Sequence, residues 1–242
     1  MFRHRGKKRT LKHNLKLSSL LSFVAGIVNV SGLFAIQRLT TNVTGHFAFF
    51  ADEVAKKNFL QAFVYLLYIL SFFFGAFFSN TLVEIVSKYN ARLANSISVS
   101  IEILILTMVA FAPGEFISGQ ANVIACLLLF SMGLQNALVT YLSNSVVRTT
   151  HLTGLFTDLG IEVSQLLFYK KEEEQKKLTS SIKLRSTIIC FFFLGGVLGG
   201  AGYLLVGIKI LLMAVLTLIL ALIYDSVKFG LVSIKRKYTA LT

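Results

Sequence analysis

Six long apolar stretches constrain the fold of this chain more than any other feature of its sequence. A helix that crosses a bilayer needs about 20 mostly apolar residues, because the hydrocarbon core is roughly 30 Å thick. The stretches that meet this requirement cover residues 18–36, 59–83, 97–112, 121–143, 186–206 and 208–226. With 55% apolar and 14% charged residues and a mean hydropathy of +0.73, the 242-residue chain lies outside the range of soluble domains. The sequence therefore predicts an all-α integral membrane protein with six transmembrane helices.

Two further segments, residues 41–56 and 150–169, are shorter or more polar than these stretches. Each carries two acidic residues, Asp52 and Glu53 in the first and Asp158 and Glu162 in the second. Charged side chains are costly inside a bilayer. We therefore do not count either segment as a spanning helix, and whether they are re-entrant stays open at this point.

The positive charge of the chain, +13 at neutral pH, follows the topology that six spans impose. With a cytoplasmic N-terminus, 20 of the 24 lysine and arginine residues fall on the cytoplasmic side. This bias obeys the positive-inside rule and predicts that both termini are cytoplasmic. Anionic lipid headgroups are then the expected partner of the basic charge, and nucleic-acid binding is not required. The first span is expected to be a retained signal anchor.

An internal repeat divides the chain into two halves. Residues 40–47 (TTNVTGHF) align with residues 149–156 (TTHLTGLF), an offset of 109, and Gly26-Ile-Val-Asn29 aligns with Gly133-Leu-Gln-Asn136. A Phe run followed by glycine comes later in both halves. Three spans in each half reverse the second half relative to the first, which predicts inverted-topology repeats. The expected organisation is a basic tail (1–17), a first repeat (18–120), a second repeat (121–227) with a cytoplasmic loop at about 170–185, and a basic tail (228–242).

The Thr-Gly segments of both halves have the composition of an interrupted helix. A helix that starts near Gly45 or Gly154 would direct its free N–H groups and its positive dipole end inward, which suits an anionic or dipolar ligand. The candidate ligand-binding residues are the polar and glycine residues of these segments: Asn42, Thr44, Gly45, His46, Thr150, His151, Thr153 and Gly154. The alternative is that they only cap helix ends and permit close packing.

Four polar residues inside the spans are candidates to line a path through the protein: Asn29, Gln135, Asn136 and Glu102. Asn29 and Asn136 occupy matching positions of the repeat. Amide side chains also form hydrogen bonds between membrane helices. Glu102 is either a functional ionisable residue or a side chain that extends to the cytoplasmic interface.

Known catalytic signatures are missing from the sequence. It has no HExxH, GxSxG or Walker A motif, and its two cysteines, Cys126 and Cys190, lie in apolar runs. We therefore expect no enzymatic activity, no catalytic residue, no metal and no cofactor.

Two motifs of the second half, Met132-Gly-Leu-Gln-Asn-Ala137 and Arg148-Thr-Thr-His-Leu-Thr-Gly154, resemble the YoaK-like family of bacterial membrane proteins. The resemblance covers about residues 15–230. It implies a multi-pass protein of the bacterial inner membrane, and it supplies no substrate because the family is a domain of unknown function. The chain departs from the family at His46 and Asn29, which puts a proton-coupled role for the first span in doubt.

These observations favour a small-solute transporter or permease with a site at the midplane, where the two Thr-Gly segments converge. The solute is unknown, and the sequence does not separate a carrier from a channel. The competing hypothesis is a non-transporting membrane scaffold or interaction protein, in which the same polar residues hold helices together. A homo-oligomer is compatible with both hypotheses.

Overall fold

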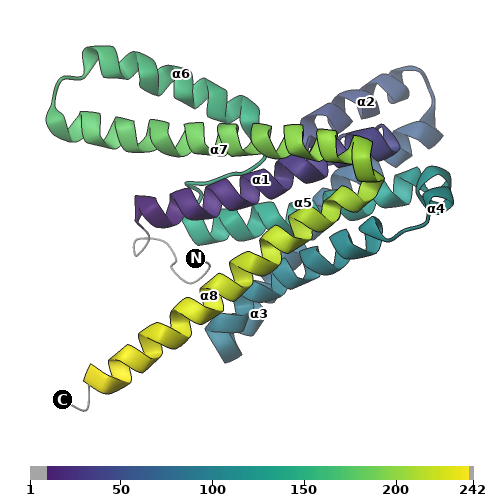
Figure 1. Cartoon of the computed structure of the whole chain (residues 1–242). Coiled ribbons are helices and arrows are strands. Elements are labelled where there is room, and N and C mark those ends of the chain that lie inside the picture. Colours follow the sequence, from purple (N-terminus) through teal and green to yellow (C-terminus); the bar gives the residue numbers. More distant parts are fainter. Residues whose placement is uncertain (1–9, 240–242) are drawn as a thin grey trace.

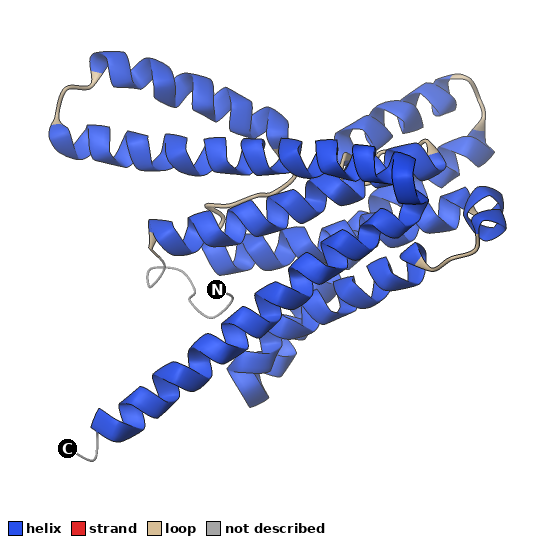
Figure 2. Cartoon of the chain, in the orientation of Figure 1, coloured by secondary structure: helices blue, strands red, loops and turns tan. Residues whose placement is uncertain are grey.

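The computed structural model describes residues 10–239, and the side chains of these residues apart from 91–92 and 227–239. This part of the chain is made of helices and loops (Figures 1 and 2). The helices are α1 (Leu11–Ile36), α2 (Val43–Ala55), α3 (Phe59–Ala110), α4 (Gly114–Gly119), α5 (Ala121–Ser143), α6 (Leu152–Phe168), α7 (Glu172–Val206), η2 (Gly207–Ile210) and α8 (Leu211–Thr239). The all-helical fold is as the sequence predicted.

Five helical stretches of the described residues are long and apolar enough to cross a membrane. They are Leu11–Ile36, Phe59–Asn90, Leu93–Ala110, Ala121–Ser143 and Glu172–Ser226. The sequence predicted six, and the difference lies in the last stretch, which is 55 residues long. It contains α7 and the part of α8 that ends at Ser226. Gly207, with a φ of +63°, and the 3-10 turn η2 separate these two helices, and Figure 1 shows the chain reversing direction there.

A kink divides α3, the longest helix, into two spans. Asn90 has φ −152° and ψ 93°, values outside the helical region, and the two candidate spans lie on either side of it. A helix of 52 residues at 1.5 Å per residue would be about 78 Å long, far more than a bilayer is thick. The kink lets the two parts fold back beside each other, and a hydrogen bond of 3.0 Å from Ser79 Oγ to Ser98 Oγ joins them.

The core of the bundle is built from two close helix crossings. In the first, a Cβ added to Gly26 of α1 would collide with the carbonyl oxygen of Phe192 in α7. In the second, a Cβ added to Gly133 of α5 would collide with the carbonyl oxygen of Phe72 in α3. Small residues let helix backbones approach this closely, and such contacts are typical of membrane helices.

The two crossings use corresponding residues of the two halves. Gly26 aligns with Gly133 in the sequence repeat, and the Phe192 and Phe72 carbonyls that they meet belong to the two Phe runs. The reciprocal contacts correspond as well: Gly195 of α7 meets the carbonyl of Phe23, and Gly75 of α3 meets that of Phe130. Each half therefore packs its first helix against the other half, so neither half forms its core alone.

Three boundaries differ from those expected. The predicted loop at about 170–185 is helical from Glu172 onward, because acidic residues stabilise the N-terminal turn of α7 and Glu172 pairs with Lys176 at 2.5 Å. The predicted tail 1–17 is helical from Leu11, since Leu11 and Leu15 pack against the core and Leu17 is buried. The predicted tail 228–242 continues α8 to Thr239. Residues 1–9 and 240–242 of these tails lie outside the described residues.

The shorter helices α2 and α6 stand at the side of the bundle. Each packs mainly on the helix that follows it, α2 on α3 and α6 on α7. Figure 1 shows α2 and α6 beginning near the middle of the molecule and running away from each other. Their starting turns carry the two Thr-Gly segments.

Candidate functional site

Each Thr-Gly segment follows a helix that ends in a left-handed residue. Gln37 (φ 54°) terminates α1 and Asn144 (φ 55°) terminates α5. This conformation turns the chain away from the helix axis. Residues 38–42 and 145–151 then connect to α2 and α6, which begin at Val43 and Leu152. The predicted interrupted helices are therefore present in both halves.

Glycine leaves space for the capping residue at the start of both short helices. In α2, Asn42 Oδ1 accepts a hydrogen bond from the Gly45 N–H at 2.9 Å. In α6, the His151 ring lies so close to Gly154 that a Cβ there would collide with Nε2, and the ring makes no capping hydrogen bond. The repeated glycine is thus explained by the side chain three residues before it.

A threonine in each connecting segment binds the matching asparagine of the preceding helix. Thr41 Oγ1 donates to Asn29 Oδ1 at 2.9 Å in the first half. Thr150 Oγ1 donates to Asn136 Oδ1 at 3.1 Å in the second. These hydrogen bonds hold the irregular backbone against the core, which is the condition for non-helical chain at membrane depth.

A cavity of about 1210 Å³ lies between the two halves. Six corresponding pairs from the two halves line it: Asn29 and Asn136, Thr41 and Thr150, Asn42 and His151, Val43 and Leu152, Thr44 and Thr153, Phe72 and Phe192. Asn42, His151 and Thr153 are also exposed at the surface, so the cavity is open. Its wall combines apolar side chains with hydroxyl, amide and imidazole groups, a composition suited to a small polar ligand.

Eight of the twelve candidate site residues line this cavity: Asn29, Asn42, Thr44, Gly45, Asn136, Thr150, His151 and Thr153. The other four, His46, Gly154, Gln135 and Glu102, are not among its lining residues. Residues of both Thr-Gly segments, 109 residues apart in the sequence, thus line the same cavity. Whether they bind a ligand stays a prediction.

His46 points away from the cavity into the α2–α3 contact. It is 1% exposed, its Nε2 lies 2.7 Å from the carbonyl oxygen of Leu39, and its ring meets that of Tyr68 edge to face at 5.0 Å. Burial lowers the pKa of His46, and the nearby positive charge of Arg38 lowers it further, while the hydrogen bond to Leu39 acts in the opposite direction. His46 therefore packs between α2 and α3 and is not a cavity residue.

Gln135 and Glu102 are both 1% exposed. Gln135 Nε2 donates to the Leu21 carbonyl oxygen at 3.0 Å, so it links α5 to α1 as an interhelical hydrogen bond. Glu102 lies within α3 and does not extend to the surface of the bundle, and its Oε1 has no hydrogen-bond partner among the described residues.

Sequence reasoning missed several residues that line the cavity, among them Asn80, Tyr141, Asn144 and Arg148. Arg148 had been assigned to the topological charge bias and to the motif that carries the family resemblance, but not to the site. Its place as the first residue of the RTTHLTG motif was the available signal. Asn80 comes from α3, far from either motif, and only the packing of α3 on α5 brings it to the cavity.

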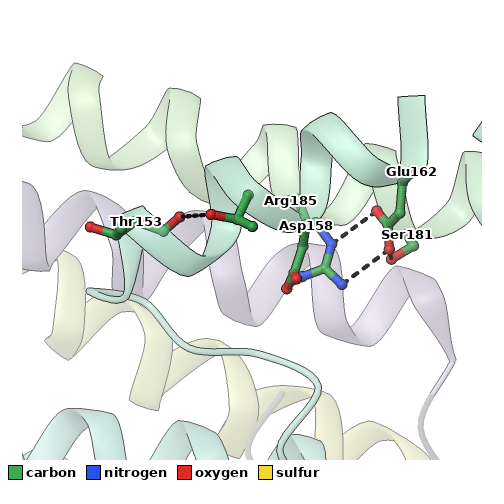
Figure 3. A network of polar contacts seen from close by, with 6 residues as sticks. Thr153, Asp158, Glu162, Ser181 and Arg185 are labelled. Carbon is green, nitrogen blue, oxygen red and sulfur yellow. Dashed lines mark hydrogen bonds and ion pairs between the residues drawn. The ribbon is translucent and has the colours of Figure 1, made fainter. Parts of the chain in front are cut away.

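A polar network joins α6 to α7 (Figure 3). The Arg185 guanidinium binds Glu162 through Nε at 2.9 Å and Asp158 through a terminal nitrogen at 2.8 Å. Ser181 Oγ donates to Glu162 Oε1 at 2.6 Å. The two acidic residues that had argued against counting residues 150–169 as a span are therefore both paired with one arginine of a neighbouring helix.

Comparison with known proteins places the chain in a group without an assigned activity. The model of a family described as "Protein of unknown function (DUF1275)" matches residues 17–224. Neither a curated protein nor a solved structure matches the chain.

Proposed function

The chain belongs to DUF1275, the family of unknown function that includes the YoaK-like proteins it resembles, and we propose that it is a small-solute transporter or permease of the bacterial inner membrane. The solute site is the cavity between the two halves. The protein is proposed to bind and move its solute without catalysis.

The proposed topology has six crossings in two inverted three-span repeats, with both termini in the cytoplasm. The reversal at Gly207–Ile210 supports the sixth crossing, because it divides the longest apolar stretch into α7 and α8. The corresponding glycine contacts of Gly26 and Gly133 support a pseudo-two-fold relation between the halves. The concentration of lysine and arginine on one side supports the orientation.

In this topology α2 and α6 are half-helices that enter from opposite sides of the membrane. Their N-termini meet near the midplane, where dipole ends and freed backbone groups act on a solute in inverted-repeat transporters. Parts of residues 37–42 and 144–151 line the cavity and others contact protein, as irregular chain in a membrane must.

One observation carries the proposal: residues that correspond in the repeat line a single open cavity from both sides. A scaffold has no need to keep the same polar positions of both halves facing one space. Alternating access requires such a site, because two halves that rock against each other expose the interface between them in turn.

The test is solute uptake into proteoliposomes by the Asn42→Ala/His151→Ala double variant. Solutes are first selected by a thermal-stability screen of the full chain, in which a ligand at 100 times its dissociation constant stabilises by about 2.7 kcal/mol. The matched control is Gln61→Ala/Gln165→Ala, which truncates one polar side chain on α3 and one on α6 outside the cavity. Transport predicts loss of uptake in the cavity variant alone, with unchanged folded yield.

The scaffold hypothesis predicts a different result in the same experiment. The cavity variant would then lose folded yield, and more thermal stability than the roughly 0.5–2 kcal/mol that losing the Asn42 cap of α2 costs under either hypothesis. No solute from a panel of anions, amino acids, sugars and nucleobases would stabilise the wild-type protein. That outcome contradicts the proposal.

A further inference from the structure

The described residues that line the cavity between the halves include a positive charge and no negative one. Among the described residues that line it, Arg148 carries the one full charge at neutral pH, and none is acidic. The remaining polar lining consists of amide, hydroxyl, phenol and imidazole groups, most of which can donate hydrogen bonds. A ligand with negative charge finds attraction there and no fixed negative charge to oppose it.

Arg148 has no hydrogen bond or ion pair with the described part of the chain and is exposed at the cavity. The contrast with Arg185 is direct, since that guanidinium binds both Asp158 and Glu162. A guanidinium presents five N–H donors in a planar arrangement that fits carboxylate and phosphate oxygens. The donors of Arg148 are left for a ligand.

The first turn of α6 adds further donors to the same wall. Its intrahelical bonding begins with the N–H of Leu155, which donates to the His151 carbonyl at 3.1 Å. The preceding N–H groups, those of residues 152–154, have no intrahelical acceptor, and the His151 side chain does not cap them. In α2 the equivalent Gly45 N–H is occupied by Asn42. The N-terminus of α6 therefore has more unpaired N–H donors for a ligand than the N-terminus of α2.

We propose that the cavity binds a solute through an anionic oxygen group, a carboxylate or a phosphate, held between Arg148 and the first turn of α6. This inference rests on the proposed function for its physiological meaning. Arg148 supplies the charge, and the N-terminus of the 17-residue helix α6 supplies fixed donors. The cavity of about 1210 Å³ accommodates a metabolite larger than the anionic group itself.

The experiment titrates the purified full chain with sodium salts of acetate, succinate and phosphate and follows thermal unfolding. Sodium chloride at equal ionic strength is the reference, and glucose and choline chloride are the neutral and cationic probes. We expect saturable stabilisation by at least one oxyanion beyond the chloride reference. Stabilisation by acetate or succinate indicates a carboxylate solute, and stabilisation by phosphate alone indicates a phosphate solute.

The decisive variants change Arg148. Arg148→Gln is expected to weaken oxyanion binding on the order of 10- to 100-fold, the loss of one charge-assisted interaction, and Arg148→Lys to weaken it less. Lys209→Gln removes the same charge from η2, outside the cavity lining, and is expected to bind like the wild type. Arg148 is exposed, so its substitution leaves the packed core untouched.

Three results would overturn the inference. The first is no oxyanion stabilisation beyond chloride, and the second is equal stabilisation of the wild type and Arg148→Gln. The third is glucose or choline binding that is unaffected by Arg148→Gln, which leaves the proposed transport site in place and removes the anion. Oxyanion binding that depends on Arg148 but gives no flux in proteoliposomes supports the inference and contradicts transport.

Discussion

The two short helices are attached to their neighbours by different chemistry at the same positions. In the first half, the Phe49 ring of α2 stacks on Tyr65 of α3 with ring centroids 5.3 Å apart. In the second half, Asp158 of α6 binds Arg185 of α7 at 2.8 Å. Phe49 and Asp158 correspond through the Thr-Gly alignment, and Tyr65 and Arg185 correspond through the glycine contacts of Gly75 and Gly195. An aromatic pair and an ion pair thus occupy equivalent places.

The buried residue of each short helix differs in the same way. It is His46 in α2 and Leu155 in α6, again at corresponding positions. Corresponding residues of the repeated sequence therefore hold each short helix at the same place, while the identity of the side chains decides how strongly and under which conditions it is held. We call α2 with the start of α3 the first hairpin, and α6 with the start of α7 the second hairpin.

The largest expected effect tests whether the two halves are equivalent at all. Gly26→Ala and Gly133→Ala each place a methyl group against a backbone carbonyl, so the helices must separate. We expect both to lower the stability by about 3 kcal/mol, the upper part of the usual range for overpacking. The measurement is thermal unfolding of the purified protein. The control is Gly160→Ala in α6, where an added Cβ meets nothing within 4 Å and better helix propensity favours folding. A loss at one crossing alone would break the equivalence.

The next effect concerns the ion pairs of the second hairpin. Arg185→Ala leaves Glu162, whose side chain is 14% exposed, without its cation. We expect a loss of about 2 kcal/mol in the attachment of α6, because an unpaired half-buried carboxylate retains its desolvation cost. Limited proteolysis and hydrogen exchange of residues 152–168 measure it.

Salt provides the control for this prediction. The loss from Arg185→Ala should shrink in 1 M NaCl, where the Debye length falls to about 3 Å. Arg185→Lys should recover part of the stability, since a lysine keeps the charge without the fork that contacts both Asp158 and Glu162. Wild-type protection of α6 after Arg185→Ala would show that the ion pairs do not hold it.

The first hairpin should respond less and without salt dependence. Tyr65→Ala removes the ring that stacks on Phe49 and also lies 5.8 Å from the Tyr68 ring. Aromatic pairs contribute about 0.5–1.5 kcal/mol beyond their buried area, and Phe49 is 48% exposed. We expect about 1 kcal/mol of destabilisation, equal at low and high salt, measured by hydrogen exchange of residues 43–55. A salt-dependent loss would contradict the assignment of this contact as aromatic.

Local identity allowed the sequence to predict the repeat and the two Thr-Gly segments. A duplicated TTxxTG pattern at a fixed offset indicates equivalent backbone, and both segments do start short helices beside one cavity. The helices extend beyond the predicted spans, back to Leu11 and Glu172, into charged residues that the sequence analysis had assigned to a tail and a loop. Glutamates at a helix start and leucines at helical spacing stabilise a helix that continues beyond the membrane.

The partners of the short helices could not be predicted in the same way. The Thr-Gly segments share one offset, whereas the helices that follow them share a longer one, because α6 has 17 residues against 13 in α2 and α7 has a longer first part than α3. Only the glycine contacts fix the second alignment, and so reveal that Tyr65 and Arg185 correspond. Arg148 was missed for a different reason: the aligned residue of the first half is the apolar Leu39, so the repeat did not mark this position as polar.

The smallest effect separates the hairpins by pH. Burial lowers the pKa of His46, so the unfolded state binds a proton more readily than the folded state. Stability of the first hairpin is then fully present above the ordinary histidine pKa of about 6.5, and it is lost as the pH falls through that value toward the lower pKa of the folded state. Leu155 gives the second hairpin no such dependence.

His46→Leu, which places the second-half residue in the first half, should remove this pH dependence. Thermal unfolding of wild type and variant at pH 7.5 and pH 5.5 measures it. We expect the wild type alone to lose stability at pH 5.5, by less than the loss caused by Tyr65→Ala. Because Nε2 of His46 contacts the Leu39 carbonyl, the variant gives up that interaction at both pH values, so the comparison depends on the slope with pH and not on the absolute stability. Equal slopes in the two proteins would mean that His46 does not make the first hairpin sensitive to acid.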